Sequence, residues 1–132
     1  MWPVNLVSAG YRAGTCNIGA VEIARRRRLG YVSLAAAALL ATALVALDVP
    51  RDSRWLLVLP LGAAFTGLLQ ARLRFCAWFG LAGLRNFGLL ADRAGVVDWA
   101  DRLADARRAL WLLAVAGGLA VFVTAAFVAL PL

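Results

Sequence analysis

Three long apolar runs restrict this chain to folds that a membrane can hold. They occupy residues 30–49, 55–70 and 109–130, and they approach the roughly 20 residues that a helix needs to cross the hydrocarbon core of a bilayer. Apolar residues make up 64% of the chain, well above the roughly half that is usual in a soluble domain. We therefore predict an all-α integral membrane protein with three transmembrane helices and short amphipathic helices at the membrane interface.

The 132 residues are enough for a single membrane domain, which glycines, prolines and charges divide into segments. We predict a loop at 1–15, an amphipathic helix at 16–29, the first span at 30–49 and the second at 55–70. The second span is short and needs an extension into the turn before it. An interfacial segment rich in cysteine, glycine and aromatic residues follows at 75–95. A second amphipathic helix at 96–108 runs into the third span at 109–130.

The two amphipathic helices have recognisable patterns. The side chain of Thr15 or Asn17 can cap the first helix, because its oxygen can accept from the free N–H groups of the first turn. The second helix has apolar residues at three- and four-residue spacing, which indicates an amphipathic helix: Val96, Trp99, Leu103, Ala106 and Leu110. Its acidic residues are expected on a solvated face beside arginines, rather than in a metal site: Asp98, Asp101 and Asp105.

Arginine supplies every positive side chain, and its distribution predicts the orientation of the chain. Arg25–Arg28 precede the first span, Arg72 and Arg74 follow the second, and further arginines precede the third. Only Arg51 and Arg54 lie in the turn on the other side. Because positive charge concentrates on the cytoplasmic side, we expect the cytoplasmic membrane of the cell, with the N-terminus cytoplasmic and the C-terminus external. The net charge of +7 is thereby explained by topology, without nucleic acid as a partner.

Cys16 and Cys76, the two cysteines, fall on the same predicted side of the membrane and are candidate thiol or binding residues. Cys16 lies at a helix start near four arginines, which predicts a lowered pKa for its thiol. Three interpretations remain open: a reactive or sulfur-carrying pair, a soft two-coordinate Cu(I) site, or two small residues that only pack. A disulfide is not expected on a reducing side, and we predict no metal and no cofactor.

Other residues are candidates for anion or lipid headgroup binding, or for shaping the chain. The cations beside the spans can attract phosphate or anionic lipid: Arg25, Arg26, Arg27, Arg28, Arg72 and Arg74. Glycines and Asn17 form a structural motif with no phosphate-loop spacing: Asn17, Gly19, Gly80, Gly83 and Gly88. The last three predict a tight return of the chain at the membrane surface, with aromatic residues as anchors.

The order of these parts resembles the YgaP-like transmembrane hairpin family of the inner membrane, over about residues 16–83. The residues that carry the resemblance are Asn17, Gly19, Arg25 or Arg28, Gly30, Thr66, Cys76, Phe79 and Gly83. The family typically has Cys-Pro where this chain has Cys76-Ala77. The resemblance implies a self-associating helical hairpin and, because some members are fused to a rhodanese domain, a link to sulfane sulfur. It supplies no catalytic residue.

These features favour a non-enzymatic membrane protein that handles or senses a sulfur species or a small anion at cytoplasmic thiols. The chain has no histidine, and no nucleophile, base and orienting group stand at a spacing that indicates catalysis. The alternative is a structural or assembly subunit of a larger respiratory or transport complex, with cysteines that only pack. Expected partners are membrane lipids and either a second copy of the chain or other subunits.

The arginine distribution makes a topological prediction. A reporter fused after Ala94 should read as cytoplasmic, and one fused after Leu132 should read as external, because the arginines hold the segment between the second and third spans inside. Paired alkaline phosphatase and fluorescent-protein fusions measure both positions. An external reading at Ala94 would contradict the three-span arrangement.

Overall fold

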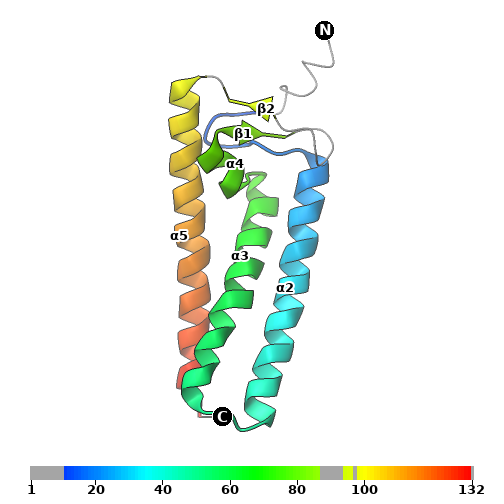
Figure 1. Cartoon of the computed structure of the whole chain (residues 1–132), viewed down its shortest axis with the longest axis vertical. Coiled ribbons are helices and arrows are strands. Elements are labelled where there is room, and N and C mark those ends of the chain that lie inside the picture. The colour runs from blue at the N-terminus through cyan, green and yellow to red at the C-terminus, as the bar shows by residue number, and fades with distance from the viewer. Residues whose placement is uncertain (1–10, 87–93, 97, 132) are drawn as a thin grey trace.

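Three long helices lie side by side in the computed structural model, which describes residues 11–86, 94–96 and 98–131. They are α2 (Ala20–Ala46), α3 (Val58–Leu73) and α5 (Trp99–Ala129). The central helix, α3, packs against both α2 and α5 and runs antiparallel to them (Figure 1). A 3-10 helix, η1 (Arg51–Leu57), joins the α2–α3 turn to α3 at one end of the bundle.

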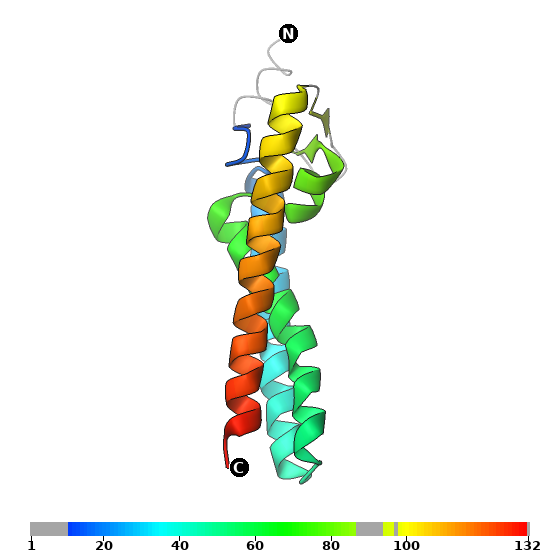
Figure 2. The ribbon, with the colours of Figure 1, turned by 90° about the vertical axis from the view of Figure 1, so that its left-hand side faces the viewer.

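Short elements cover the opposite end of the bundle. They are α4 (Ala77–Ala82) and the antiparallel strands β1 (Leu84–Arg85) and β2 (Ala94–Gly95), in which Leu84 pairs with Gly95 and Arg85 with Ala94. Figure 2 shows the bundle from the side of α5, whose first turns rise beside these elements. We call this the arginine-rich end, because it carries Arg12, Arg25–Arg28, Arg72 and Arg74.

The three helices are long and apolar enough to cross a membrane, which confirms the all-α prediction with three candidate spans. The candidate spans are Ala20–Ala46, Arg51–Leu73 and Trp99–Ala129, so the second includes η1, as its short apolar run required. Their outer surface is apolar: Leu39, Leu59 and Phe122 are at least 70% exposed. Large apolar side chains that point outward along all three helices suit contact with lipid rather than water.

The helices are more continuous than expected. The predicted amphipathic helix at 16–29 and the span at 30–49 form one helix, α2, which begins at Ala20 and passes through Gly30 without a break. Its N-cap is Gly19, and neither Thr15 nor Asn17 caps it. The second amphipathic helix was predicted to run into the third span. This is confirmed, because α5 runs from Trp99 into the third span as a single helix.

The buried face of α5 does not coincide with the apolar side of its amphipathic pattern. Trp99, Leu103 and Leu110 are 68%, 41% and 60% exposed, whereas the side chain of Asp105 is fully buried. The buried face follows small residues along the helix, in the series Asp105, Ala109, Leu112, Ala116, Ala120 and Thr124. Helices in membranes pack through small residues, because lipid solvates large apolar side chains as well as a neighbouring helix does.

Arg54, which was predicted to lie in the turn between the first two spans, is also buried, at the end opposite the arginine-rich end. Its Nη1 donates to the carbonyl oxygens of Phe127 (3.3 Å) and Leu130 (3.1 Å), and its guanidinium lies 5.1 Å from the centroid of the Phe127 ring. These carbonyls belong to the last turn of α5, where helical C=O groups lack partners within the helix. Arg54 thus ties the end of α5 to the start of the second span.

Glycine sets the closest approach between helices. A Cβ added at Gly67 would lie 2.9 Å from the Arg26 carbonyl oxygen and 3.0 Å from the Gly30 backbone. A Cβ added at Gly62 would lie 4.0 Å from the Ala120 Cβ of α5, so this face of α3 is in contact within the chain. Gly117 and Gly118, by contrast, have open space around them. The α2–α3 crossing therefore depends on Gly30 and Gly67.

Substitution at this crossing should destabilise the bundle. Gly67→Ala places a methyl group against backbone atoms that cannot rotate away, so we expect a loss of about 1–3 kcal/mol, the range for overpacked cores. Unfolding in mixed micelles measures the change. Gly118→Ala is the matched control, because its methyl group meets open space, and it should cause no loss. Equal stability of the two variants would contradict the close crossing.

Candidate anion pocket at the arginine-rich end

The side chain of Asn17 joins the N-terminal segment to the turn between α3 and α4. Its Nδ2 donates to the Cys76 carbonyl oxygen (3.1 Å), and its Oδ1 accepts from the Cys76 backbone N–H (2.7 Å). The backbone N–H of Asn17 also donates to the Arg74 carbonyl oxygen (3.2 Å). α3 ends here because Arg74 adopts the left-handed conformation, with φ of 55°. Asn17 satisfies the backbone groups that this turn leaves without helical partners.

The segment before α2 folds back over the bundle in two steps. Residues Arg12–Cys16 form a tight turn, in which the backbone N–H groups of Thr15 and Cys16 both donate to the Arg12 carbonyl oxygen. Residues 17–19 then lie beside Asn86: Gly19 N–H donates to the Asn86 carbonyl (2.8 Å), and Asn86 N–H donates to the Asn17 carbonyl (2.9 Å). The segment itself folds back, whereas α2 continues straight into its span.

Asp105 on α5 anchors the start of this segment, 91 residues away from Gly14 in the sequence. Its carboxylate accepts from the Tyr11 hydroxyl (2.7 Å) and from the Gly14 backbone N–H (2.7 Å). Burial, and next the hydrogen bond to Asp105, raise the pKa of Tyr11 above its usual range. The solvated acidic face expected for this helix is therefore wrong at Asp105. Asp98 has another role, because it caps α5 by accepting from Ala100 N–H.

An open pocket of about 920 Å³ lies between the folded-back segment, the start of α2 and the end of α3. Four arginines line it: Arg12, Arg27, Arg72 and Arg74. No carboxylate is among its lining residues, and the ion pairs of the described residues involve other arginines. Arginine remains protonated at neutral pH, and its guanidinium forms paired hydrogen bonds to phosphate and carboxylate oxygens. The pocket therefore has the charge and the donors for an oxyanion.

The N-terminus of α2 adds to the positive potential of this pocket. Gly19 and Ala20 line it, and no side chain caps the helix. The N–H groups of a first helical turn carry partial positive charge and lack partners within the helix. This contribution has the same sign as that of the four arginines, so the electrostatic environment of the pocket is consistently positive.

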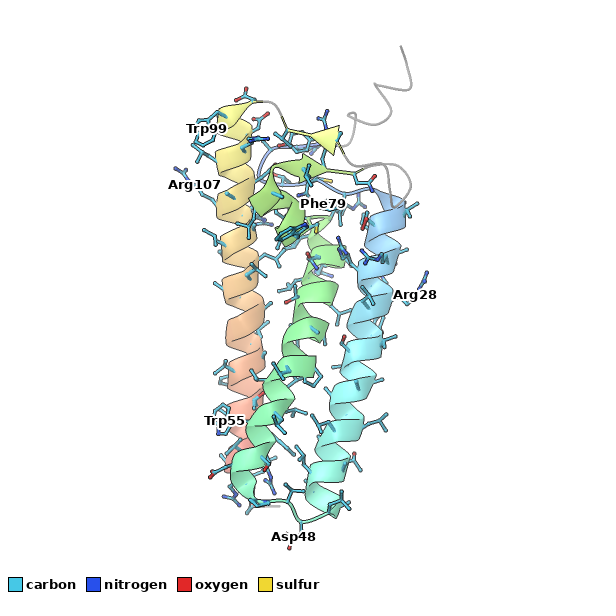
Figure 3. The ribbon with its side chains drawn as sticks, in the orientation of Figure 1. Arg28, Asp48, Trp55, Phe79, Trp99 and Arg107 are labelled. Carbon is cyan, nitrogen blue, oxygen red and sulfur yellow. The ribbon has the colours of Figure 1, made fainter. Side chains whose placement is uncertain are left out.

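The arginines predicted from the sequence have three different positions. Arg27, Arg72 and Arg74 line the pocket. Arg25 and Arg26 form ion pairs with the buried carboxylate of Glu22, at 3.6 and 3.3 Å. Arg28 points away from the bundle (Figure 3). The fourth pocket arginine, Arg12, was not predicted, because its position depends on a turn in a segment that carries no periodic pattern.

The two cysteines are free thiols in different surroundings. Cys16 lines the pocket, and its Sγ–H donates to the Ile18 carbonyl oxygen at 3.7 Å. Cys76 is 1% exposed and packs with Ile18 and Phe79. Its Sγ accepts from Arg26 Nη2 at 3.0 Å, and the Arg26 guanidinium lies 5.7 Å from the centroid of the Phe79 ring. Only Cys16 can therefore meet a ligand in the pocket.

Burial raises the pKa of the Cys16 thiol, the opposite of the expected depression. The hydrogen bond to Ile18 and the charges of Arg74 and Arg12 act in the other direction, but more weakly. The thiolate is the reactive form of cysteine, so neutral pH favours an unreactive thiol here. Among the described residues, no three potential metal-ligating side chains come together either. The arrangement can bind an anion beside a thiol.

Two of the predicted glycines shape the part of the arginine-rich end that α4 and β1 form. Gly83 has φ of +72°, which lets the chain turn from α4 into β1, and the Arg102 guanidinium lies close beside it. Gly80 lies against the Phe75 ring and the Asp105 backbone, where a Cβ would come within 2.9 Å. Gly83 therefore lies at a turn of the chain, whereas Gly80 lies within α4 and allows close packing rather than a turn. Gly88 lies outside the described residues.

The raised pKa of Cys16 leads to a prediction about alkylation. In a Cys76→Ala protein, the rate of Cys16 alkylation by iodoacetamide should rise with pH around a midpoint above the usual thiol value of about 8.5. Arg74→Gln should move the midpoint higher still, because Arg74 favours the thiolate. Mass spectrometry measures the rates. A midpoint below that of a free thiol would contradict this description of the site.

Comparisons with protein-family models, with curated proteins and with solved structures found no match to this chain. The resemblance to YgaP-like hairpins therefore rests on the motif residues alone. Of these, Asn17 and Cys76 are joined by hydrogen bonds, and Phe79 packs against Cys76.

Proposed function

We propose that this chain is a non-enzymatic protein of the cytoplasmic membrane that binds a small oxyanion at the arginine-rich end and senses it through Cys16. The observation that carries this proposal is the pocket lined by four arginines and a thiol, without a carboxylate. The positive-inside rule supports a cytoplasmic position for this end, with the C-terminus external. The anion then reaches the pocket from the cytoplasmic side of the membrane.

The chemistry of the pocket supports phosphate, sulfate or a sulfur oxyanion as the ligand. Each presents several oxygens to guanidinium groups, which bind them in pairs. The resemblance to a family linked with sulfane sulfur favours an anion that contains sulfur. Sensing requires no covalent step: a bound anion covers the Cys16 thiol and adds negative charge beside it, so its accessibility reports occupancy.

Anion binding can be measured by isothermal titration calorimetry on the detergent-solubilised chain, with phosphate, sulfate and thiosulfate as probes. Arg72→Gln and Arg74→Gln should each weaken binding about tenfold or more, because a charge-assisted hydrogen bond contributes roughly 1.5–3 kcal/mol. Arg51→Gln is the control, since Arg51 is exposed at the opposite end of the bundle. Binding of none of the probes, or an equal effect of Arg51→Gln, would contradict the proposal.

A structural or assembly subunit is the second candidate, and one observation favours it. Gly117 and Gly118 leave an open, flat place on α5, of the kind through which membrane helices approach one another. A second copy of the chain or another subunit could dock there while the cysteines only pack. This candidate is preferred if the calorimetry finds no anion binding.

A further inference from the structure

The position of the pocket relative to the ends of the spans indicates where its anion comes from. The uncharged part of α2, Leu29–Ala46, is about 27 Å long at 1.5 Å per residue, close to the roughly 30 Å of a hydrocarbon core. Arg27 precedes this part by two residues, and Arg72 directly follows the uncharged part of α3. Both arginines line the pocket. The pocket therefore opens at the depth of the lipid headgroups, where phosphate groups are concentrated.

The lining of the pocket is mixed rather than wholly polar. Beside its arginines it has apolar residues, namely Ile18, Ile23, Ala24, Ala71 and Leu73. At about 920 Å³ it is as large as sites that hold whole small molecules. A tetrahedral oxyanion alone would contact the guanidinium groups and leave the apolar wall uncovered. A phosphate ester attached to an apolar body would cover both.

We propose that the occupant of the pocket is the headgroup of an anionic phospholipid, with its phosphate between Arg27 and Arg72. This inference rests on the proposed anion binding and names the class of ligand. Arg12 and Arg74, which also line the pocket, complete the set of positive side chains around the phosphate. The glycerol backbone lies against the apolar wall, and the acyl chains pass to the lipid around the bundle. The shared chemistry is a phosphate group, which a free anion also offers.

Cys16 provides a direct measure of occupancy. It lines the pocket, whereas Cys76, the other cysteine of the chain, is 1% exposed. In a Cys76→Ala protein, a water-soluble maleimide therefore reads the accessibility of the pocket alone. The experiment compares its rate in nanodiscs of phosphatidylcholine with the rate in nanodiscs that also contain phosphatidic acid. We expect phosphatidic acid to slow alkylation.

Arg27 and Arg28 form a matched pair that separates a site from general surface charge. They are neighbours on α2 with the same charge, but only Arg27 lines the pocket, and Arg28 points away from the bundle (Figure 3). Arg27→Gln and Arg72→Gln should each weaken lipid protection about fivefold, which corresponds to one arginine contact near a membrane surface. Arg28→Gln should retain it. Each rate is divided by that of the same variant without phosphatidic acid, which removes direct effects on the thiol.

The outcomes distinguish this inference from the proposed function. Protection by phosphatidic acid that Arg27→Gln weakens and Arg28→Gln retains supports a lipid headgroup. An equal loss in the two variants shows general surface charge and overturns the lipid site. Protection by inorganic phosphate in phosphatidylcholine nanodiscs, with none by phosphatidic acid, overturns the lipid while the anion site stands. Protection by neither overturns both.

Discussion

The paired hydrogen bonds between the Asn17 side chain and the Cys76 backbone hold the arginine-rich end together. A turn that leaves α3 in the interior cannot be hydrated, and an unpaired buried amide group costs roughly 1–3 kcal/mol. Asn17 supplies both a donor and an acceptor there, and it is fully buried. Because it precedes α2 by three residues, the same bonds fix where α2 begins and where Cys16 lies. The wall of the pocket therefore forms because Asn17 supplies the hydrogen bonds that the backbone of this one turn needs.

The spans could be predicted from the sequence because charge and hydropathy act locally. A run such as Leu29–Leu47 has no charged side chain to keep it in water, so its length alone indicates a span. The packed face of α5 could not be predicted from the same rule. In water, Trp99 and Leu103 would mark the buried face, but here they are exposed and Asp105 is buried. The series of mostly small residues that begins at Ala109 indicates the packed face better. Small side chains let the backbones of membrane helices approach closely.

The residue types of the candidate site could be predicted from the sequence. Which of the arginines line the pocket could not. Arginines at the ends of spans indicate anion binding, but adjacent residues on a helix point in directions about 100° apart, which follows from 3.6 residues per turn. Whether Arg27 or Arg28 faces the pocket depends on how α2 crosses α3, and that crossing is set by Gly30 and Gly67. Arg12 depends on a contact still more distant in sequence, because Asp105 holds the turn that carries it.

The two thiols have surroundings that suit the proposed binding of an anion better than a reaction. Positive charge beside Cys16 favours the thiolate, yet burial opposes it more strongly, and the pKa of the thiol is raised. A pocket that gathered anions beside a thiolate would gather like charges, so a neutral thiol is compatible with an anionic ligand where an ionised one is not. Cys76 contacts Arg26 but lies inside, out of reach of a ligand in the pocket. The positive charge of this end therefore does not outweigh burial at Cys16, and in the function we propose it attracts a ligand rather than activating a nucleophile.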